Sequence, residues 1–281
     1  MKQSQGEFEG LATYTIEVDG QERSYEVFEP SAYAGKLPAI FMFHGSQSSG
    51  EELSKYIEFN KIAEKEKYLV IYPNALVGNW AEACDCNIAD RLEVKDIEFV
   101  YSIIDQIKSN YTVDLENIYA VGYSQGGLFT DRIACEMSNV FKGAIVVAAN
   151  MSVPLSISCE PSELMPITFI QGMDDVVLNY YGSDNGNLSL LSAKETARFW
   201  ALKNNIISTP ITSYIPNDQD PSVEVLLYKA DNNQIGKEVI GGLNITLFSL
   251  YGVGHTWPST KEFNTNSEIN DFILKYMTGH L

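Results

Sequence analysis

Positive charge is scarce in this sequence, and long apolar runs are absent. Lysine and arginine number 19 against 37 aspartate and glutamate residues, so the net charge at neutral pH is −18. A chain with this charge repels nucleic-acid phosphates and anionic membrane surfaces, which excludes nucleic acid as a partner. No stretch approaches the ~18 consecutive apolar residues of a membrane-spanning helix, so we expect no membrane span.

Internal repeats and the features of a signal peptide are also lacking. The absence of a repeat excludes collagen-like and coiled-coil architectures. Residues 1–10 are polar and acidic, so we expect any export signal to have been removed. The 281 residues, 45% of them hydrophobic, are enough to bury a large core, and no linker divides them. We therefore predict a single domain spanning residues 1–281.

Short apolar runs alternate with helix-like segments from residue 38 onward. Apolar runs bounded by Gly, Pro or Asn are typical of strands buried on both faces, and they occur at residues 39–43, 68–72, 117–121, 144–149 and 167–170. Helical spacing of apolar residues marks residues 51–67, 97–107, 193–204 and 267–277. We also expect a hairpin of residues 11–18 and 23–28, an extended loop within 205–244 and a late strand at 245–250. Together these segments predict an α/β fold with one doubly wound, mostly parallel sheet and flanking helices.

The strongest motif is Gly122-Tyr-Ser-Gln-Gly126, between the apolar run 117–121 and a helix-compatible segment. This context is that of a nucleophile elbow, in which a tight strand-to-helix turn lifts a serine hydroxyl above the sheet. The turn leaves no room for bulk two residues before and after the serine, which accounts for the two glycines. We predict Ser124 as a nucleophile; the alternative is a glycine-rich turn that merely contains a serine.

A serine hydroxyl needs a base within hydrogen-bonding reach, and the sequence offers three histidines. His280 is the penultimate residue, where chain ends fray, which makes it a poor candidate. His255 lies in a glycine-rich loop just after the strand expected at 245–250, at the kind of strand end where α/β folds place their sites. We therefore predict His255 as the base.

An acid that orients the imidazole completes such a triad, and the chain order serine, acid, histidine places it between residues 124 and 255. The run at 167–170 is followed by Gln171-Gly-Met-Asp-Asp175. We favour Asp175 over Asp174, because the acid usually follows a short turn after the strand. Asp231 and Asp184 are weaker candidates.

Two backbone N–H groups are expected to stabilise the oxyanion. One is that of Gln125, the residue after the nucleophile, and the other is that of Ser46, in the loop after the strand expected at 39–43. Gly45 allows this loop unusual backbone dihedral angles. We expect the third histidine, His44, to brace the loop through hydrogen bonds rather than to act as a base.

These stretches together resemble a group of α/β-hydrolases that includes polyhydroxybutyrate depolymerase-like enzymes, feruloyl esterases and acetylxylan esterases. The most diagnostic part is Gly254-His-Thr-Trp-Pro258. The resemblance covers most of the chain, including residues 23–30, 38–45, 72–75, 96–99, 122–127, 172–175 and 199–200. It implies the α/β-hydrolase fold, with Ser124 as nucleophile, Asp175 as acid and His255 as base. The chain departs from the group at Gln171, where histidine is more usual.

The resemblance implies a secreted serine carboxylesterase that works through an acyl-enzyme. Its expected substrates are feruloyl or acetyl esters of plant cell-wall polysaccharide, or a small-molecule ester. A depolymerase of polyhydroxyalkanoates or short hydroxyalkanoate esters is the alternative enzyme, and an inactive carbohydrate-binding module is the alternative outside enzymes. No cofactor is implied, and the sequence does not indicate an oligomeric state.

Four cysteines remain. Cys135 and Cys159 resemble a disulfide pair of this group, and a disulfide would place the protein outside the cytoplasm, as a secreted, periplasmic or cell-surface protein. Cys84 and Cys86 form a Cys-x-Cys pair, in which a disulfide would be strained, so free thiols and other pairings stay open. A zinc site is the competing idea; we expect no metal, because the histidines are assigned elsewhere.

Aromatic side chains close to the predicted catalytic loops are candidates for contact with the substrate. We expect Trp257, two residues after His255, to be the first of these. The others are Trp80, Tyr123 and Tyr180. The competing interpretation is ordinary core packing, since the chain holds 16 tyrosines and 13 phenylalanines and most of them must be buried.

Overall fold

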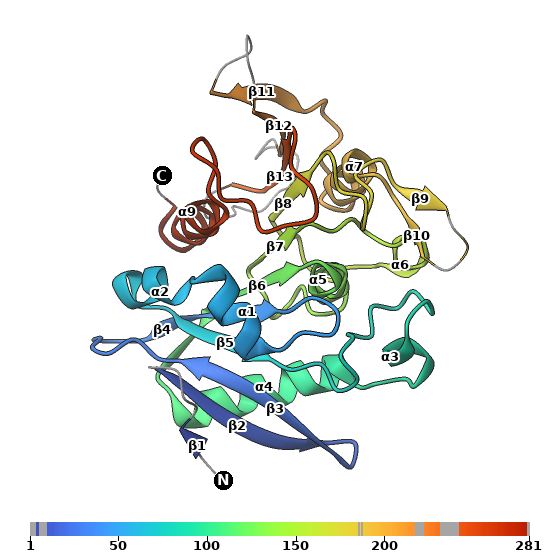
Figure 1. Cartoon of the computed structure of the whole chain (residues 1–281). Coiled ribbons are helices and arrows are strands. Elements are labelled where there is room, and N and C mark those ends of the chain that lie inside the picture. Colours follow the sequence, from blue (N-terminus) through green and yellow to red (C-terminus); the bar gives the residue numbers. More distant parts are fainter. Residues whose placement is uncertain are drawn as a thin grey trace.

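The computed structural model of the protein describes residues 4–5, 10–184, 186, 188–216, 222–230 and 242–279 (Figure 1). Its main sheet has the described strand order β1-β2-β3-β5-β4-β6-β7-β8-β13-β12-β11, and β9 pairs with β10 separately. The strands are β1 (Ser4–Gln5), β2 (Leu11–Val18), β3 (Gln21–Phe28), β4 (Leu37–Phe43), β5 (Leu69–Pro73), β6 (Val113–Tyr123), β7 (Gly143–Val147), β8 (Ile167–Gly172), β9 (Ser183–Asp184), β10 (Ser189–Leu190), β11 (Ile211–Ile215), β12 (Val223–Lys229) and β13 (Asn244–Leu250).

The centre of the sheet is parallel and its two margins are antiparallel. Strands β5, β4, β6, β7, β8 and β13 run parallel to one another. The hairpin β2–β3 joins β5 antiparallel on one side, and β12 and β11 join β13 antiparallel on the other. The prediction of an α/β fold with a mostly parallel sheet is therefore confirmed, as are the hairpin at residues 11–28 and the strand at 245–250.

Helices cover both faces of the sheet, and each face has its own apolar core. In β4, Ala39, Phe41 and Phe43 belong to one core and Ile40 and Met42 to the other, because side chains alternate along a strand. The first core packs under α4, α5 and α7, and the second under α1, α2 and α9 (Figure 1). The helices are α1 (Gly50–Ile57), α2 (Asn60–Glu66), α3 (Ile88–Arg91), α4 (Asp96–Asn110), α5 (Gln125–Glu136), α6 (Val153–Ser158), α7 (Ala193–Lys203) and α9 (Thr265–Thr278). None of these described helices combines the length and the apolar character needed to span a membrane.

Two expectations from the sequence need correction. The helical pattern at 51–67 is two helices, because Glu58 ends α1 in the left-handed backbone conformation, with φ +52°. The extended loop expected within 205–244 is interrupted by β11 and β12, and residues 217–221 and 231–241 of this region lie outside the described residues. Strand β11 lies at the sheet margin with its first three residues exposed, so it lacks the apolar run that identified the central strands.

Candidate active site

Ser124 occupies a sharp turn between β6 and α5. Its backbone has φ +57° and ψ −124°, a conformation that L-residues adopt only where the surroundings enforce it. A Cβ atom at Gly122 would collide with the carbonyl oxygen of Gly126 and with Oγ1 of Thr130, and one at Gly126 would collide with the carbonyl oxygen of Phe43. Both glycines are therefore required by the close approach of strand and helix, as the elbow motif predicts.

The structure brings Ser124, His255 and Asp175 together from the ends of three strands. Nε2 of His255 lies 2.8 Å from Oγ of Ser124, and its Nδ1 lies 2.7 Å from Oδ2 of Asp175. Because a carboxylate only accepts hydrogen bonds, Nδ1 carries the proton in this pair and Nε2 is left as the acceptor. The arrangement thus sets a basic nitrogen against the serine hydroxyl.

The Asp175 carboxylate is held in place by its own loop. Its Oδ1 accepts hydrogen bonds from the backbone N–H groups of Val177, at 2.8 Å, and Leu178, at 2.9 Å. Nε2 of Gln171 donates to the carbonyl oxygen of Leu178 at 2.9 Å and lies 3.4 Å from Oδ2 of Asp175. Gln171, which the sequence marked only as a departure from the resemblance, therefore supports the acid. Asp174 is exposed to solvent.

The remaining acid and base candidates from the sequence do not reach this arrangement. Asp184 lies in β9 and accepts a hydrogen bond from Oγ of Ser189 at 3.2 Å. Asp231 and His280 lie outside the described residues.

The loop after β4 lies directly beside Ser124. A Cβ atom built on Gly45 would lie 3.3 Å from Cβ of Ser124 and 3.6 Å from its Oγ. Among the described residues, the backbone N–H groups of Ser46 and Gln125 have no hydrogen-bond acceptor. Two donors without acceptors next to the serine agree with an oxyanion hole, although their role stays a prediction.

His44 holds this loop in place, as expected. Its Nε2 accepts a hydrogen bond from the backbone N–H of Ala75 at 3.1 Å, so the proton resides on Nδ1, which donates to the carbonyl oxygen of Gly45 at 2.7 Å. Burial lowers the pKa of His44, which favours this neutral form. Both ring nitrogens are thus engaged, and His44 is not free to act as a base.

Trp80 lies beneath the site rather than in a substrate cleft. Its side chain is 0% exposed, and its indole N–H donates to the carbonyl oxygen of His44 at 3.0 Å. Its backbone is bound to the side chain of Gln125 through two hydrogen bonds. The expectation that Trp80 contacts the substrate is corrected, because a side chain without exposed surface offers none to a ligand.

Tyr180 also needs correction as a substrate contact. It is 2% exposed, and its hydroxyl pairs with Oγ of Ser249 at 2.8 Å. Trp257 is largely buried, at 8% exposed, and its ring meets that of Tyr123 edge-on at 6.0 Å. Tyr123 is only partly buried, and its ring stacks on His255 at 5.6 Å. For Trp257 and Tyr123, contact with the substrate stays a prediction.

Tyr56, a residue of α1 that no sequence pattern indicated, lies beside this group. The Tyr56 ring lies 5.8 Å from that of Tyr123 and is 53% exposed. Its hydroxyl accepts a hydrogen bond from the backbone N–H of Trp257 at 3.2 Å and lies 3.0 Å from Oγ1 of Thr256. No motif surrounds Tyr56 in the sequence, and about 200 residues separate it from its partners, so only the fold reveals the contact.

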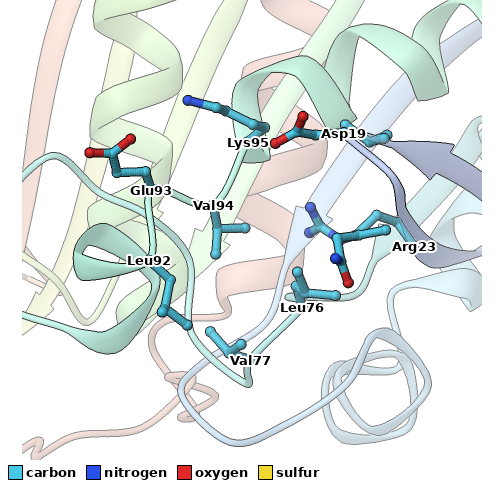
Figure 2. A pocket seen from close by; sticks show the side chains of 10 residues that line it. Asp19, Arg23, Leu76, Val77, Leu92, Glu93, Val94 and Lys95 are labelled. Carbon is cyan, nitrogen blue, oxygen red and sulfur yellow. The ribbon is translucent and has the colours of Figure 1, made fainter.

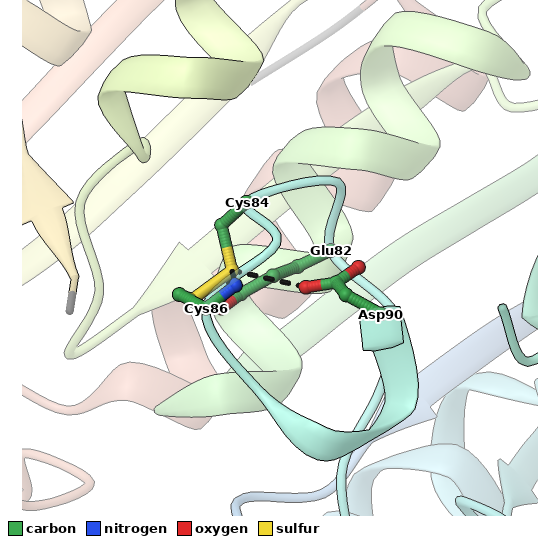
Figure 3. A group of neighbouring side chains, drawn as sticks. All are labelled: Glu82, Cys84, Cys86 and Asp90. Atoms are coloured by element: carbon green, nitrogen blue, oxygen red, sulfur yellow. Dashed lines mark hydrogen bonds between the residues drawn. A yellow bond between two sulfur atoms is a disulfide. The ribbon is translucent and has the colours of Figure 1, made fainter. Parts of the chain in front are cut away.

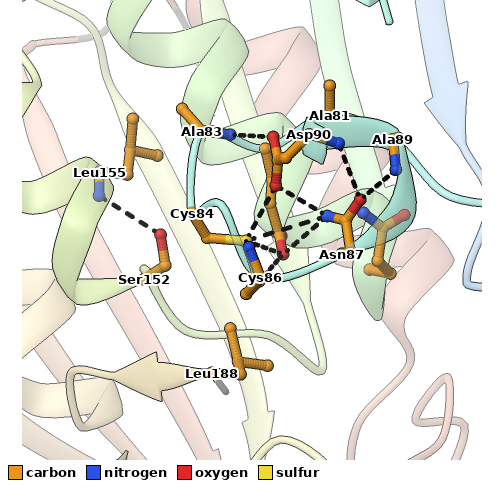
Figure 4. The surroundings of a disulfide bond; sticks show 12 residues. Ala81, Ala83, Cys84, Cys86, Asn87, Ala89, Asp90, Ser152, Leu155 and Leu188 are labelled. Atoms are coloured by element: carbon orange, nitrogen blue, oxygen red, sulfur yellow. Dashed lines mark hydrogen bonds between the residues drawn. A yellow bond between two sulfur atoms is a disulfide. The ribbon is translucent and has the colours of Figure 1, made fainter. Parts of the chain in front are cut away.

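The structure contains two disulfides among the described residues. Cys135 of α5 pairs with Cys159, the residue that ends α6, as the resemblance implied. Cys84 pairs with Cys86, one of the possibilities that the sequence left open. Figure 4 shows this second bond in the segment that leads into α3, with Ser152 and Leu155 of the α6 region nearby.

A cavity of about 470 Å³ lies between the β2–β3 hairpin and the segment before α4 (Figure 2). The triad residues are not part of its lining. Arg23, on its wall, is paired with the buried Asp96 at 2.6 Å and lies over the Phe99 ring. Asp19, Glu93 and Lys95 add charges of both signs, so the cavity does not select a class of charged ligand.

The chain is similar to known esterases in sequence and in fold. No family model matches it. It is 29% identical over 164 residues to a bifunctional acetylxylan esterase/xylanase of Neocallimastix patriciarum. The matched region covers 57% of this chain and 22% of that protein. It is 23% identical to feruloyl esterase B of Piromyces equi, over 84% of this chain and 44% of that protein. The chain thus spans less than half the length of these two relatives.

A third relative is poly(3-hydroxyalkanoate) depolymerase C of Paucimonas lemoignei, 22% identical over 82% of this chain and 57% of that protein. Among solved structures, an acetyl xylan esterase from Aspergillus awamori superposes with a TM-score of 0.66 at 13% identity, over 95% of this chain and 99% of that one. The fold is that of the α/β-hydrolases. Within this fold, Ser124, His255 and Asp175 follow the carboxyl ends of β6, β13 and β8, where open α/β sheets place their sites.

Proposed function

We propose that this protein is a serine carboxylesterase. The observation that carries the proposal is the hydrogen-bonded series from Oγ of Ser124 through His255 to Asp175, at 2.8 and 2.7 Å. A base in contact with a serine hydroxyl, itself oriented by a carboxylate, is the arrangement that activates serine as a nucleophile. Homologues named as esterases support the same reaction class.

The geometry defines the proposed steps. Oγ of Ser124 attacks the ester carbonyl carbon while its proton passes to Nε2 of His255. The positive charge that develops on the imidazole is stabilised by Asp175, and the negative charge on the carbonyl oxygen by the N–H groups of Gln125 and Ser46. His255 returns the proton to the leaving alcohol, and a water molecule then hydrolyses the acyl-enzyme by the same route in reverse.

The proposed substrates are feruloyl or acetyl esters carried by plant cell-wall polysaccharide. Relatives named as feruloyl esterase and acetylxylan esterase support this class. Tyr56 and Tyr123 add exposed aromatic surface beside His255, on which a hydroxycinnamoyl ring can stack. The relative named as a poly(3-hydroxyalkanoate) depolymerase supports the alternative, a hydroxyalkanoate ester.

Two further proposals concern the whole chain. We propose that residues 1–281 form one catalytic domain, in keeping with the single large sheet of the described residues. We also propose that the protein functions outside the cytoplasm, as a secreted, periplasmic or cell-surface protein. Two disulfides support this location, because disulfides persist in oxidising compartments.

Hydrolysis of methyl ferulate and p-nitrophenyl acetate by the wild type and by Ser124→Ala tests the function. We expect the wild type to cleave both esters and the variant to lose activity by several orders of magnitude. Cleavage of the acetate alone would favour acetyl or other small esters as substrates. Equal activity of variant and wild type would overturn the proposal. A wild type that binds polysaccharide but is not labelled by an organophosphonate would favour the inactive carbohydrate-binding module.

A further inference from the structure

Four side chains capable of binding a metal ion gather outside the proposed active site. Three come from the segment between Trp80 and α3 and the fourth from α3 itself, and one ligand atom from each lies within 4.8 Å of all the others (Figure 3). We call them the thiol–carboxylate cluster: Glu82, Cys84, Cys86 and Asp90. This grouping was hard to predict from the sequence, because no histidine lies in the segment and two of the four donors are carboxylates.

The carboxylates of this cluster face sulfur atoms. Oε1 of Glu82 lies 3.1 Å from Sγ of Cys84 and 3.2 Å from Sγ of Cys86. Oδ2 of Asp90 lies 3.0 Å from Sγ of Cys84. A disulfide sulfur has no proton to donate, so with Cys84 and Cys86 bonded these contacts provide no hydrogen bond to either carboxylate. Thiol protons or a metal ion at the same place would turn each contact into an attractive one.

Glu82 is the most unusual member of the cluster. It is 1% exposed, and its Oε2 has no hydrogen-bond partner among the described residues. Nδ2 of Asn87 is 3.4 Å from Oε1 and donates at 3.0 Å to Oδ2 of Asp90 as well. A buried carboxylate without a cation is costly.

Two guanidinium groups close to the cluster are already hydrogen-bonded to other groups. That of Arg91 donates to the carbonyl oxygen of Cys86 at 3.2 Å. The guanidinium group of Arg132 binds the carboxylate of Glu136 at 2.7 Å and the carbonyl oxygen of Ala81 at 2.8 Å. Asp131, fully buried and with its Oδ2 unpartnered among the described residues, adds a further acidic group to the same part of the interior. This part of the interior therefore holds carboxylates in excess of cations.

We propose that Glu82, Cys84, Cys86 and Asp90 form a binding site for a thiophilic divalent cation of the Zn²⁺ type when the Cys84–Cys86 bond is reduced. A dithiol reductant supplies two electrons and two protons to the disulfide and is itself oxidised to a disulfide. Zn²⁺ then displaces the two thiol protons into solvent and is bound by two thiolates and two carboxylates.

The spacing of the donors suits such an ion. Zinc binds thiolate sulfur at about 2.3 Å and carboxylate oxygen at about 2.0–2.2 Å, which sets the donors of a tetrahedral site about 3.5 Å apart. The sulfur–carboxylate distances of 3.0 to 3.2 Å are already close to this value. Reduction frees the two sulfurs to separate to the same spacing. A hard cation such as Ca²⁺ would select a site made of oxygen alone.

Anaerobic titration of the reduced full-length protein with Co²⁺, a spectroscopic substitute for Zn²⁺, tests the proposal. We expect one Co²⁺ per chain, with sulfur-to-cobalt charge-transfer absorption that Zn²⁺ abolishes by displacement, and no such absorption for the oxidised protein. Cys84→Ser/Cys86→Ser should lose the absorption. Cys135→Ser/Cys159→Ser should retain it, because this second pair lies outside the cluster.

Two further measurements separate metal binding from loss of the fold. Glu82→Gln retains both thiols and should weaken Co²⁺ binding at least about tenfold, the loss that even an outer-sphere partner causes. In the reduced wild type, Zn²⁺ should slow alkylation of Cys84 and Cys86 but not of Cys135 and Cys159, as read by mass spectrometry. Failure of Zn²⁺ to protect Cys84 and Cys86, or Co²⁺ absorption that survives Cys84→Ser/Cys86→Ser, overturns the proposal.

Discussion

Gln125 and Trp80 are joined by a pair of hydrogen bonds. The backbone N–H of Trp80 donates to Oε1 of Gln125 at 2.8 Å, and Nε2 of Gln125 donates to the carbonyl oxygen of Trp80 at 2.6 Å. The same residue that offers its backbone N–H to the proposed oxyanion hole is therefore fixed through its side chain to the segment beneath the site. The position of that N–H depends on a loop about 45 residues away in the chain.

Gln125→Met should lower kcat for p-nitrophenyl acetate by about tenfold to a hundredfold, less than the loss of an oxyanion donor itself. Methionine is similar in length but makes neither hydrogen bond, so the N–H is no longer held and two buried backbone groups lose their partners. Gln125→Glu keeps the side-chain oxygen that accepts from the N–H of Trp80, so its kcat should fall between those of Gln125→Met and the wild type. If the methionine variant is less stable to heat but its kcat stays within twofold, the pair has a structural role alone.

Asp175→Asn should reduce kcat by about 10⁴-fold, because an amide does not hold His255 in the tautomer that accepts the serine proton. Asp174→Asn is the matched control at the neighbouring, exposed position and should retain wild-type activity. Steady-state hydrolysis of p-nitrophenyl acetate, with circular dichroism to check folding, distinguishes the two. Equal losses in the two variants would contradict the assignment of Asp175.

Tyr56→Ala should raise KM for methyl ferulate several-fold and change KM for p-nitrophenyl acetate much less. The reason is that a stacked aromatic contact contributes about 0.5–1.5 kcal/mol and the acetyl group does not make one. Tyr101→Ala removes a comparably exposed tyrosine from α4, which covers the other face of the sheet, and serves as the control. If KM rises equally for both esters, the ring does not contact the acyl group.

Asp131→Asn should change how stability depends on pH. Burial raises the pKa of Asp131 to about 7, against about 3.9 in an unfolded chain. Between these values the unfolded state loses a proton that the folded state retains, so stability present below about pH 4 is lost as the pH rises toward 7. The free energy of unfolding of the variant should therefore rise relative to that of the wild type as the pH increases from about 4 to about 7, by up to about 1.4 kcal/mol per pH unit. Urea unfolding at several pH values measures the difference in free energy of unfolding between the two proteins. A difference that does not change with pH would contradict the prediction.

The central strands and the elbow were predictable from the sequence because each depends on local residues. Strands buried on both faces must be continuously apolar, and the turn at Ser124 tolerates only glycine two residues away on either side. The role of His44 could also be predicted, because it follows directly after β4. In each of these cases the physical requirement acts on residues that are adjacent in the chain.

Depth within the fold was harder to predict. Trp80 and Tyr180 were expected to contact the substrate, yet both are buried, because the sequence of a loop does not reveal which of its side chains face the core and which face solvent. Glu58 interrupts the helical pattern of 51–67 without a glycine or proline to signal it. The contact of Tyr56 with Trp257 and the clustering of Glu82 with Cys84 and Asp90 depend on side-chain positions that only the folded chain defines.

The origin of the triad from three separate strands has a kinetic consequence. Ser124 and His255 are 131 residues apart, and they meet only when β6, β7, β8 and β13 have paired side by side. Pairing of distant parallel strands is slow, whereas helices form from local contacts. After dilution from denaturant, helical circular dichroism should therefore recover before esterase activity does, and the delay between the two signals measures completion of the central sheet.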